Sequence, residues 1–307
     1  MSDSERRSGT VSALFVSEAS MRWNSIRHAR TPNGSLLLAI LLLRALPFEN
    51  AFSQGTAGSP PANRPMARGD ANSAQAHQQM LETLKKGRID LYFAGDSITR
   101  RWRATDYPQF LANWNENFFG WNAANFGWGG DTIQNILWRL QNGELDGVHP
   151  KVIVLLAGTN NVGKTPPSEA EVANITRGIK ALLDAMLEKA PRTTIIVMGI
   201  LPRNDGAQPT VIIPSINRIN QNIAKLADGK RIRYLNINDK LADKDGKLFD
   251  GMTVDRLHLS LKGYQVWGDA LKPLLKELLG PPAKEDHAPP PTGDPRASSK
   301  RKGGSRS

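Results

Sequence analysis

Five short apolar segments alternate along the chain with segments of helical periodicity. The apolar segments carry apolar side chains toward both faces, which is typical of strands covered on both sides. They are Ile89–Ala94, Ala123–Phe126, Val152–Ala157, Thr194–Gly199 and Ile232–Asn236. The helical segments are 76–86, Asp131–Gln141, Ser168–Lys189, Ile212–Asp228 and Ser260–Leu279. This alternation predicts one α/β domain with a five-stranded parallel sheet.

The segments on either side of this domain differ from it in composition. Hydrophobic residues make up 39% of the chain, which is low for a wholly globular protein. Residues 54–75 are rich in Gly, Pro, Ala, Asn and Ser, and we expect a flexible linker there. Residues 281–307 are rich in Pro, Ser and Lys, and we expect a disordered basic tail. The predicted globular domain therefore spans residues 76–280.

The N-terminal extension, residues 1–53, contains an apolar run that indicates a secretory signal peptide. The run, Leu36–Leu43, is shorter than the roughly 20 residues that a membrane-spanning helix needs. Arginines precede it and small residues follow, so we predict secretion or export to the periplasm. The basic segment fits a signal peptide best if translation starts at Met21, with cleavage near residues 51–54. The alternative is a disordered cytosolic extension.

Composition and spacing exclude several kinds of site. The absence of cysteine excludes disulfides, thiolate nucleophiles and cysteine-based metal sites. The net charge is +11, and residues 1–75 and 281–307 contribute more than half of it. No basic stretch is interleaved with aromatic residues, so we expect no nucleic-acid partner. No group of His and Asp residues has the spacing of metal ligands, so we expect no metal site.

Polar and glycine residues follow four of the predicted strands. These segments are Gly95-Asp96-Ser97, Asn125–Asp131, Gly158–Asn161 and Leu201–Arg203. Because the carboxyl ends of parallel strands share one edge of a sheet, these residues can meet in space. Ser97, between a strand and a helix, is placed to attack an electrophile. The alternative is that Asp96 or Ser97 merely caps the following helix.

A serine nucleophile needs a base, and the five histidines of the chain leave one candidate. The other four lie in the terminal segments, at the start of the first helix or before the third strand: His28, His287, His77 and His149. His258 follows the last strand, on a loop that can return to the active edge. Asp255 precedes it by three residues and can reach the imidazole Nδ1 while Nε2 faces the serine.

A tetrahedral oxyanion also needs fixed hydrogen-bond donors. Candidates are the backbone N–H groups of Ser97 and Gly130 and the side-chain amide of Asn160. The alternatives are a simple turn at the glycines and a helix cap or Asx-turn at Asn160 and Asn161. Trp128 is a candidate wall of the substrate pocket, with core packing as the alternative. Arg203 is a candidate for binding an anionic leaving group, with a salt bridge as the alternative.

Taken together, four short blocks resemble those of the SGNH (GDSL-type) hydrolases. They are Gly95-Asp-Ser97, Gly130 after Asn125-Phe-Gly-Trp-Gly, Gly158-Thr-Asn160 and Asp255-x-x-His258. The blocks, together with Leu137-Trp-Arg-Leu-Gln-Asn-Gly-Glu-Leu and Leu201-Pro-Arg, are most similar to the branch with the catalytic α subunits of platelet-activating-factor acetylhydrolase. The resemblance runs from about Ile89 to Leu279.

This resemblance implies a three-layer, flavodoxin-like fold with strand order 2-1-3-4-5. It implies Ser97 as nucleophile, His258 as general base and acid, and Asp255 as its partner. Ser97, Gly130 and Asn160 would donate to the oxyanion, with no metal and no cofactor. The branch is often dimeric, so we expect a monomer or a homodimer.

The sequence thus predicts a serine esterase that hydrolyses short-chain esters, foremost acetyl esters, of a carbohydrate or small alcohol. The lack of a long apolar lid argues against a long-chain lipase, and we expect no stable membrane insertion. A lipid esterase and a non-catalytic glycan-binding module on the same fold are the alternatives. Transfer of the acyl group to an acceptor other than water is a further alternative.

Overall fold

The computed structural model describes residues 60–206 and 209–297. Its five strands form one sheet in the order β2-β1-β3-β4-β5, and every neighbouring pair is parallel. The strands are β1 (Leu91–Gly95), β2 (Ala123–Gly127), β3 (Val152–Leu156), β4 (Thr194–Met198) and β5 (Ile232–Leu235). The predicted α/β fold and strand order are confirmed.

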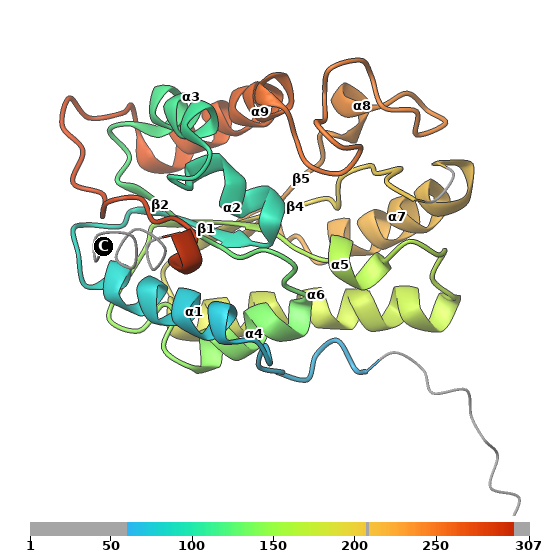
Figure 1. The fold of residues 1–307 in the computed structure, drawn as a ribbon, viewed down its shortest axis with the longest axis horizontal. Coiled ribbons are helices and arrows are strands. Elements are labelled where there is room, and N and C mark those ends of the chain that lie inside the picture. The colour runs from blue at the N-terminus through green and yellow to red at the C-terminus, as the bar shows by residue number, and fades with distance from the viewer. Residues whose placement is uncertain (1–59, 207–208, 298–307) are drawn as a thin grey trace, which may run out of the picture. The chain divides into compact units, whose positions relative to one another are not determined.

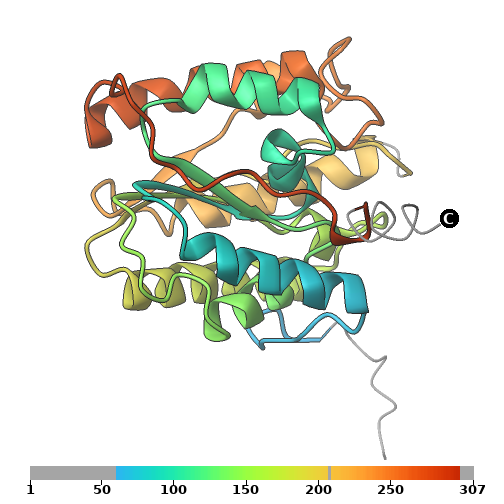
Figure 2. The same ribbon diagram turned by 60° about the vertical axis from the view of Figure 1, so that its left-hand side comes forward.

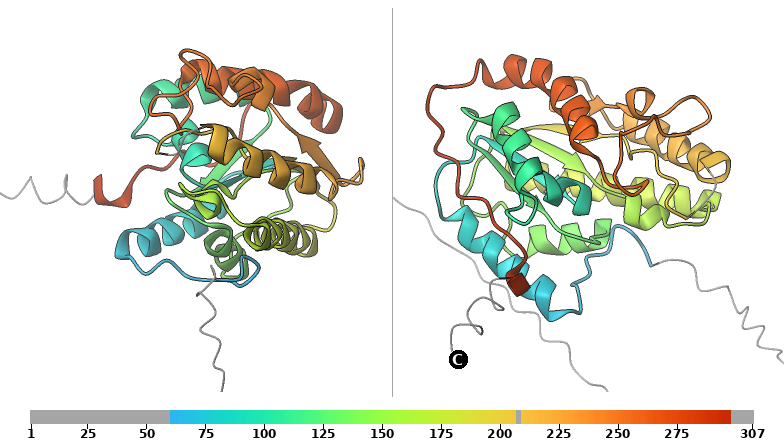
Figure 3. Two further views of the ribbon diagram at one scale, coloured as in Figure 1. Left: turned by 90° about the vertical axis from the view of Figure 1, so that its right-hand side faces the viewer. Right: turned by 45° about the horizontal axis from the view of Figure 1, so that its top comes forward.

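Helices cover both faces of the sheet and give three layers (Figure 1). One face carries α1 (Ala71–Leu84), α4 (Ile133–Gln141), α6 (Glu169–Lys189) and α7 (Pro209–Ala224). The opposite face carries α2 (Ser97–Arg103), α3 (Pro108–Phe118), α8 (Asn238–Leu241) and α9 (Leu261–Leu279). A short helix, α5 (Thr159–Val162), follows β3. Figure 3 shows the two helical layers from two further directions.

The interior strand β1, which lies between β2 and β3, shows why the sheet needs cover on both sides. All five of its residues are buried. Tyr92 and Ala94 contact the core beneath α1, α4, α6 and α7, whereas Leu91 and Phe93 contact the core beneath α2, α3 and α9. Successive side chains of a strand point to opposite faces, so a continuous apolar run is required here.

The strand register brings the polar segments to one edge. Gly95, the last residue of β1, pairs with Gly127 of β2 and with Leu156 of β3. The three strands therefore end at the same level, and the segments that follow them start side by side. This edge is the one at which parallel α/β sheets bind ligands.

The prediction of a disordered tail is wrong for residues 281–297, which lie along the domain. The backbone N–H of Ala283 donates to Gly120 O (2.9 Å), and Thr105 N–H donates to Thr292 O (3.0 Å). Asp286 accepts from the backbone N–H of Gly120 (2.6 Å). Figure 2 shows this segment in dark red, crossing from the end of α9 toward α1. Backbone and side-chain hydrogen bonds hold this segment in place, so its lack of apolar residues did not indicate disorder.

The predicted linker is likewise wrong from residue 60 onward. Helix α1 begins at Ala71 rather than at 76, because Asp70 caps it by accepting from the N–H of Ser73 (2.8 Å). Ahead of the cap, Ala62 is fully buried, and its N–H donates to Asn174 Oδ1 (2.9 Å). We call residues 60–70 the N-terminal arm.

The predicted signal peptide, start site and cleavage site fall within residues 1–59 and lie outside the described residues. Among residues 60–206 and 209–297, no helix is both long and apolar enough to span a membrane.

Candidate active site

Ser97 is the first residue of α2 and directly follows the turn after β1. The turn is held by Asp96, which is fully buried and accepts from the N–H of Ile98 (2.9 Å). Burial raises the pKa of Asp96 to about 7. A Cβ at Gly95 would lie 2.2 Å from Thr99 Oγ1 and 2.5 Å from Leu156 O, so this position requires glycine. The cap expected of Asp96 is thus present, and the Ser97 side chain remains available.

Ser97, His258 and Asp255 form a continuous chain of hydrogen bonds. His258 Nε2 lies 2.9 Å from Ser97 Oγ, and His258 Nδ1 lies 2.7 Å from Asp255 Oδ2. With a proton on Nδ1, the imidazole donates to the carboxylate and accepts from the serine hydroxyl. The geometry is that of a nucleophile, a base and a group that orients the base.

A tight loop before α9 sets the spacing of Asp255 and His258. Asp255 Oδ1 accepts from the backbone N–H groups of His258 (2.7 Å) and Leu257 (3.2 Å). Arg256, between them, has a φ of 65°, and Val254 N–H donates to His258 O (2.9 Å). The carboxylate therefore orients both the loop and the imidazole.

The electrostatics of the loop favour a neutral histidine. Burial, assisted by the nearby charge of Arg101, lowers the pKa of His258 below 6.5, against the opposing effect of Asp255. Burial alone would raise the pKa of Asp255, but hydrogen bonds from the His258 backbone and ring bring it below its ordinary value. At neutral pH the pair is thus a neutral imidazole beside a carboxylate, which suits a general base.

The loop after β2 reaches the same edge and contains Gly130. Trp128 N–H donates to Gly95 O (3.1 Å), which ties the loop to the turn before Ser97. Gly130 has a φ of 76°, a conformation that favours glycine. Asn160, in α5, donates from its side-chain amide to Asp131 O (2.8 Å). Gly130 and Asn160 therefore lie on neighbouring segments of one edge. We call residues 127–131 the glycine loop.

Asn161 has the helix-capping role that was the alternative for Asn160 and Asn161. Its Oδ1 accepts from the backbone N–H of Ile133 (2.9 Å), the first residue of α4. Its amide donates to Gln134 Oε1 (2.8 Å). Asn161 thus holds α4 against α5 and keeps the glycine loop, which lies just before α4, in place.

Trp128 and Arg203 are both buried and bonded to protein groups. Trp128 is 7% exposed, and its Nε1 donates to Ser73 Oγ of α1 (2.9 Å). Arg203 is 5% exposed, pairs with Asp205 (2.7 Å) and donates to Thr159 O (2.8 Å). For each residue the contacts are those of the alternative, core packing for Trp128 and a salt bridge for Arg203.

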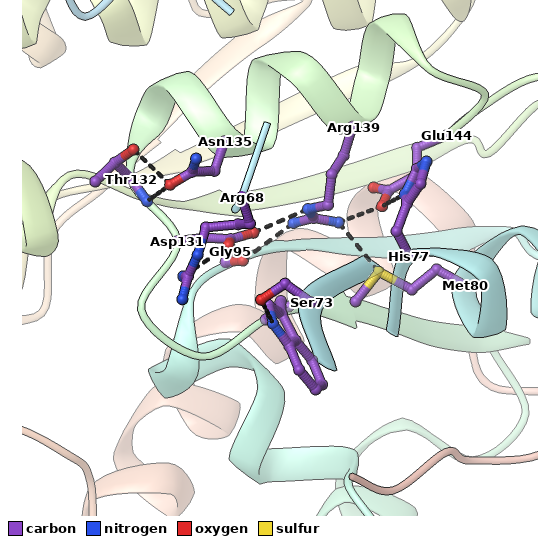
Figure 4. A network of polar contacts seen from close by, with 12 residues as sticks. Arg68, Ser73, His77, Met80, Gly95, Asp131, Thr132, Asn135, Arg139 and Glu144 are labelled. Atoms are coloured by element: carbon purple, nitrogen blue, oxygen red, sulfur yellow. Dashed lines mark hydrogen bonds and ion pairs between the residues drawn. The ribbon is translucent and has the colours of Figure 1, made fainter. Parts of the chain in front are cut away.

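Beneath the glycine loop lies a buried charge network that the sequence analysis missed (Figure 4). Arg139 of α4 is 4% exposed, donates to Asp131 Oδ2 (2.9 Å) and pairs with Glu144. Burial raises the pKa of Asp131 to about 6, against the charges of Arg139 and Arg68. The sequence did contain a signal for this network, because Arg139 and Glu144 both belong to the block Leu137–Leu145, which resembles the acetylhydrolase branch.

A cavity of about 220 Å³ opens beside the glycine loop. Its lining comes from the N-terminal arm, α1, α2, the glycine loop and the segment 281–297. The lining residues include Arg68, Ser73, Arg100, Trp128, Gly129 and Arg296. Within the described residues, no three His, Cys, Asp or Glu side chains are grouped so that they could hold a metal ion.

Comparison with known proteins identifies the class. The model of the GDSL-like lipase/acylhydrolase family matches residues 93–266. The chain belongs to this family, and it is a hydrolase that acts on esters.

Particular relatives narrow the position within the family. The chain is 33% identical to the platelet-activating factor acetylhydrolase IB subunit alpha1 of Bos taurus over 240 residues, 76% of this chain and 97% of the relative. It is also 33% identical to subunit alpha2 of Rattus norvegicus over 236 residues, 74% of this chain and 95% of the relative. A GDSL-like lipase from Bacteroides thetaiotaomicron has the same fold, with a TM-score of 0.53 and 18% identity over 67% of this chain and 99% of that one.

Proposed function

We propose that the protein is a serine esterase that cleaves short-chain carboxylic esters, foremost acetyl esters, of a carbohydrate or small alcohol. The observation that carries the proposal is the hydrogen-bond chain from Ser97 Oγ through His258 to Asp255. The preference for acetyl esters is supported by relatives named acetylhydrolases that the chain covers almost completely.

The reaction proceeds in two halves through an acyl-enzyme. Ser97 Oγ attacks the ester carbonyl carbon while His258 Nε2 takes the hydroxyl proton, and Asp255 stabilises the resulting imidazolium. His258 then gives the proton to the departing alkoxide, and the acyl group stays on Ser97. Water attacks the acyl carbon with His258 as base again, which releases the acid and restores the serine.

The oxyanion formed in each half is held by the N–H groups of Ser97 and Gly130 and the amide of Asn160. One such donor typically contributes about 3–4 kcal/mol to lowering the barrier. The glycine at position 130 supports this role. Because glycine has no side chain of its own, its backbone N–H can approach the reacting atom closely.

A lipid ester is the second candidate substrate. Val254, directly before Asp255, is 55% exposed, and Leu261 at the start of α9 is 44% exposed. Two exposed apolar side chains beside the His258 loop suit an acyl glycerolipid better than a sugar.

Hydrolysis assays on the full-length protein test the proposal. We expect p-nitrophenyl acetate to be cleaved faster than the butyrate and the octanoate, and Ser97→Ala to remove this activity. An acetylated oligosaccharide and an acetylated glycerophospholipid, compared by kcat/KM, then decide the alcohol. Equal activity of wild type and Ser97→Ala, or a preference for octanoate, would contradict the proposal.

A further inference from the structure

We propose that Arg68 is a positioning residue for the oxyanion site, because it fixes the peptide bond that presents the Gly130 N–H. The inference rests on the proposed function, in which that N–H is one of the oxyanion donors. Arg68 lies in the N-terminal arm, outside residues 93–266 that match the family model.

The N-terminal arm is firmly attached to α4 and α6, so it can hold Arg68 in one place. Ala62 is fully buried against α6, where Asn174 accepts its N–H. Met66 N–H donates to Gln134 O (3.1 Å), and Asn135 of α4 donates to Met66 O (2.8 Å). The arm is thus anchored at two points within a few residues of Arg68.

The guanidinium of Arg68 contacts the glycine loop at the peptide before Gly130. Arg68 Nη1 donates to Gly129 O (3.0 Å), and a Cβ built on Gly130 would lie 3.0 Å from the same nitrogen. Arg68 Nη2 pairs with Asp70 (3.2 Å), which orients the guanidinium toward the loop.

A carbonyl held in this way also fixes the neighbouring N–H. The Gly129 oxygen and the Gly130 N–H belong to one trans peptide plane and point in opposite directions. Neither glycine has a Cβ, so this plane rotates more freely than any other in the loop. By holding the oxygen, Arg68 keeps the N–H on the opposite side, where the oxyanion would form.

The charge of Arg68 strengthens the same donor. A hydrogen bond from a guanidinium to a carbonyl is charge-assisted and polarises the peptide. Polarisation through a chain of hydrogen bonds makes the Gly130 N–H a stronger donor. The site thus gains both a fixed direction and a better donor.

Asp131, the next residue of the loop, is held by other groups. Rotation of the backbone is therefore confined to the Gly129–Gly130 peptide. Asp131 is fully buried and bonded to Arg139, and its backbone O accepts from Asn160 (2.8 Å). Arg68 Nη1 also lies 3.5 Å from Asp131 Oδ1. With Asp131 fixed, the orientation of the Gly129–Gly130 peptide depends mainly on Arg68.

Kinetics of full-length Arg68→Ala and Arg68→Lys with p-nitrophenyl acetate test this role. We expect Arg68→Ala to lower kcat by about 10- to 100-fold, less than the full loss of an oxyanion donor, with KM changed by less than about two-fold. Arg68→Lys keeps the charge and a donor group but not the two separate nitrogens that contact Gly129 and Asp70, so its kcat is expected to be intermediate. Arg64→Ala, an exposed arginine of the same arm, is the matched control and keeps wild-type kinetics.

Added guanidinium ion separates positioning from a merely structural role. In folded Arg68→Ala we expect it to restore several-fold of the lost kcat, with no effect on Arg64→Ala. The affinity for a trifluoromethyl ketone, which forms an oxyanion on the serine, should fall by the same factor as kcat/KM. If Arg68→Ala does not fold, the Arg68→Lys loss in kcat and in ketone affinity decides.

A kcat of Arg68→Ala within about two-fold of wild type, or a loss in KM alone, would overturn the role of Arg68. A lowered kcat that guanidinium does not restore, with ketone affinity unchanged, would overturn it as well. In these cases the wild type still shows Ser97-dependent hydrolysis, so the proposed function stands. If the wild type itself lacks Ser97-dependent hydrolysis, the proposed function fails, and this inference fails with it.

Discussion

Ser97 Oγ lies 2.9 Å from His258 Nε2, although 161 positions separate the two residues in the chain. Each side chain is positioned by a local interaction. The buried Asp96 caps the helix that begins at Ser97, and Asp255 accepts from the backbone N–H of His258. The sheet then brings the two residues together, since β1 ends at the edge that the His258 loop reaches. The reactivity that we propose for Ser97 depends on the protonation of this histidine.

The first prediction concerns the pH dependence of kcat/KM. The base must be neutral, and the pKa of His258 lies below 6.5, so activity should fall as the pH drops through a value below 6.5. Arg101→Gln removes a positive charge that lowers this pKa, so the acidic limb should move to higher pH. Asp255→Asn removes a charge that raises it, so the limb should move to lower pH, with a reduced plateau. A limb that stays in place, or moves the opposite way in Arg101→Gln, would contradict this account of the site.

The second prediction concerns the buried network beneath the glycine loop. Arg139→Met removes the cation that the buried Asp131 and Glu144 share and leaves Asp131 only the more distant Arg68 (3.5 Å), which should lower the free energy of unfolding by about 3–5 kcal/mol at pH 8. Denaturant unfolding measures the loss. Arg218→Met removes an exposed arginine paired with Glu169 and should cost at most about 1 kcal/mol.

The pH dependence of this loss has a defined sign. Without Arg139, the folded-state pKa of Glu144, which this arginine holds below its ordinary value, rises above that of the unfolded chain, and the pKa of Asp131, already raised to about 6, rises further. The folded state then binds more protons than the unfolded state, so its stability falls as the pH rises. The difference between Arg139→Met and wild type should therefore be smaller at pH 5 than at pH 8, and a larger difference at pH 5 would contradict it.

The third prediction concerns residues 281–297. Asp286→Ala leaves the backbone N–H of Gly120 without its acceptor, so we expect a loss of about 1–3 kcal/mol in the free energy of unfolding. Glu285→Ala, at the neighbouring exposed carboxylate, should change it by less than about 0.5 kcal/mol. Equal effects of the two substitutions would show that the segment contributes nothing through Asp286.

The sequence predicted the sheet because its strands are short, apolar and separated by helices with clear periodicity. It missed α3, although Phe110, Trp114 and Phe118 recur at helical spacing and are all buried. It selected Ser97 and His258 because the topology of a parallel sheet restricts where reactive residues can meet. The roles of these residues remain a proposal.

The flanking segments were misjudged for a physical reason. Composition tells how much apolar surface a segment can bury, but residues 60–70 and 281–297 are held largely by hydrogen bonds to distant groups. Asp286 and Gly120 are 166 positions apart, and Arg68 and Gly129 are 61 apart. Such pairings form only in the complete fold, so no local pattern in the sequence predicts them.

Active-site labelling tests the central claim most directly. Full-length protein is treated with a fluorophosphonate and digested, and the modified peptide is identified by mass spectrometry, with Ser97→Ala treated alongside. We predict one modification, on Ser97, that is lost in Ser97→Ala together with hydrolysis of p-nitrophenyl acetate. Labelling at another residue, or hydrolysis that persists in Ser97→Ala, would contradict the assignment of Ser97 as the nucleophile.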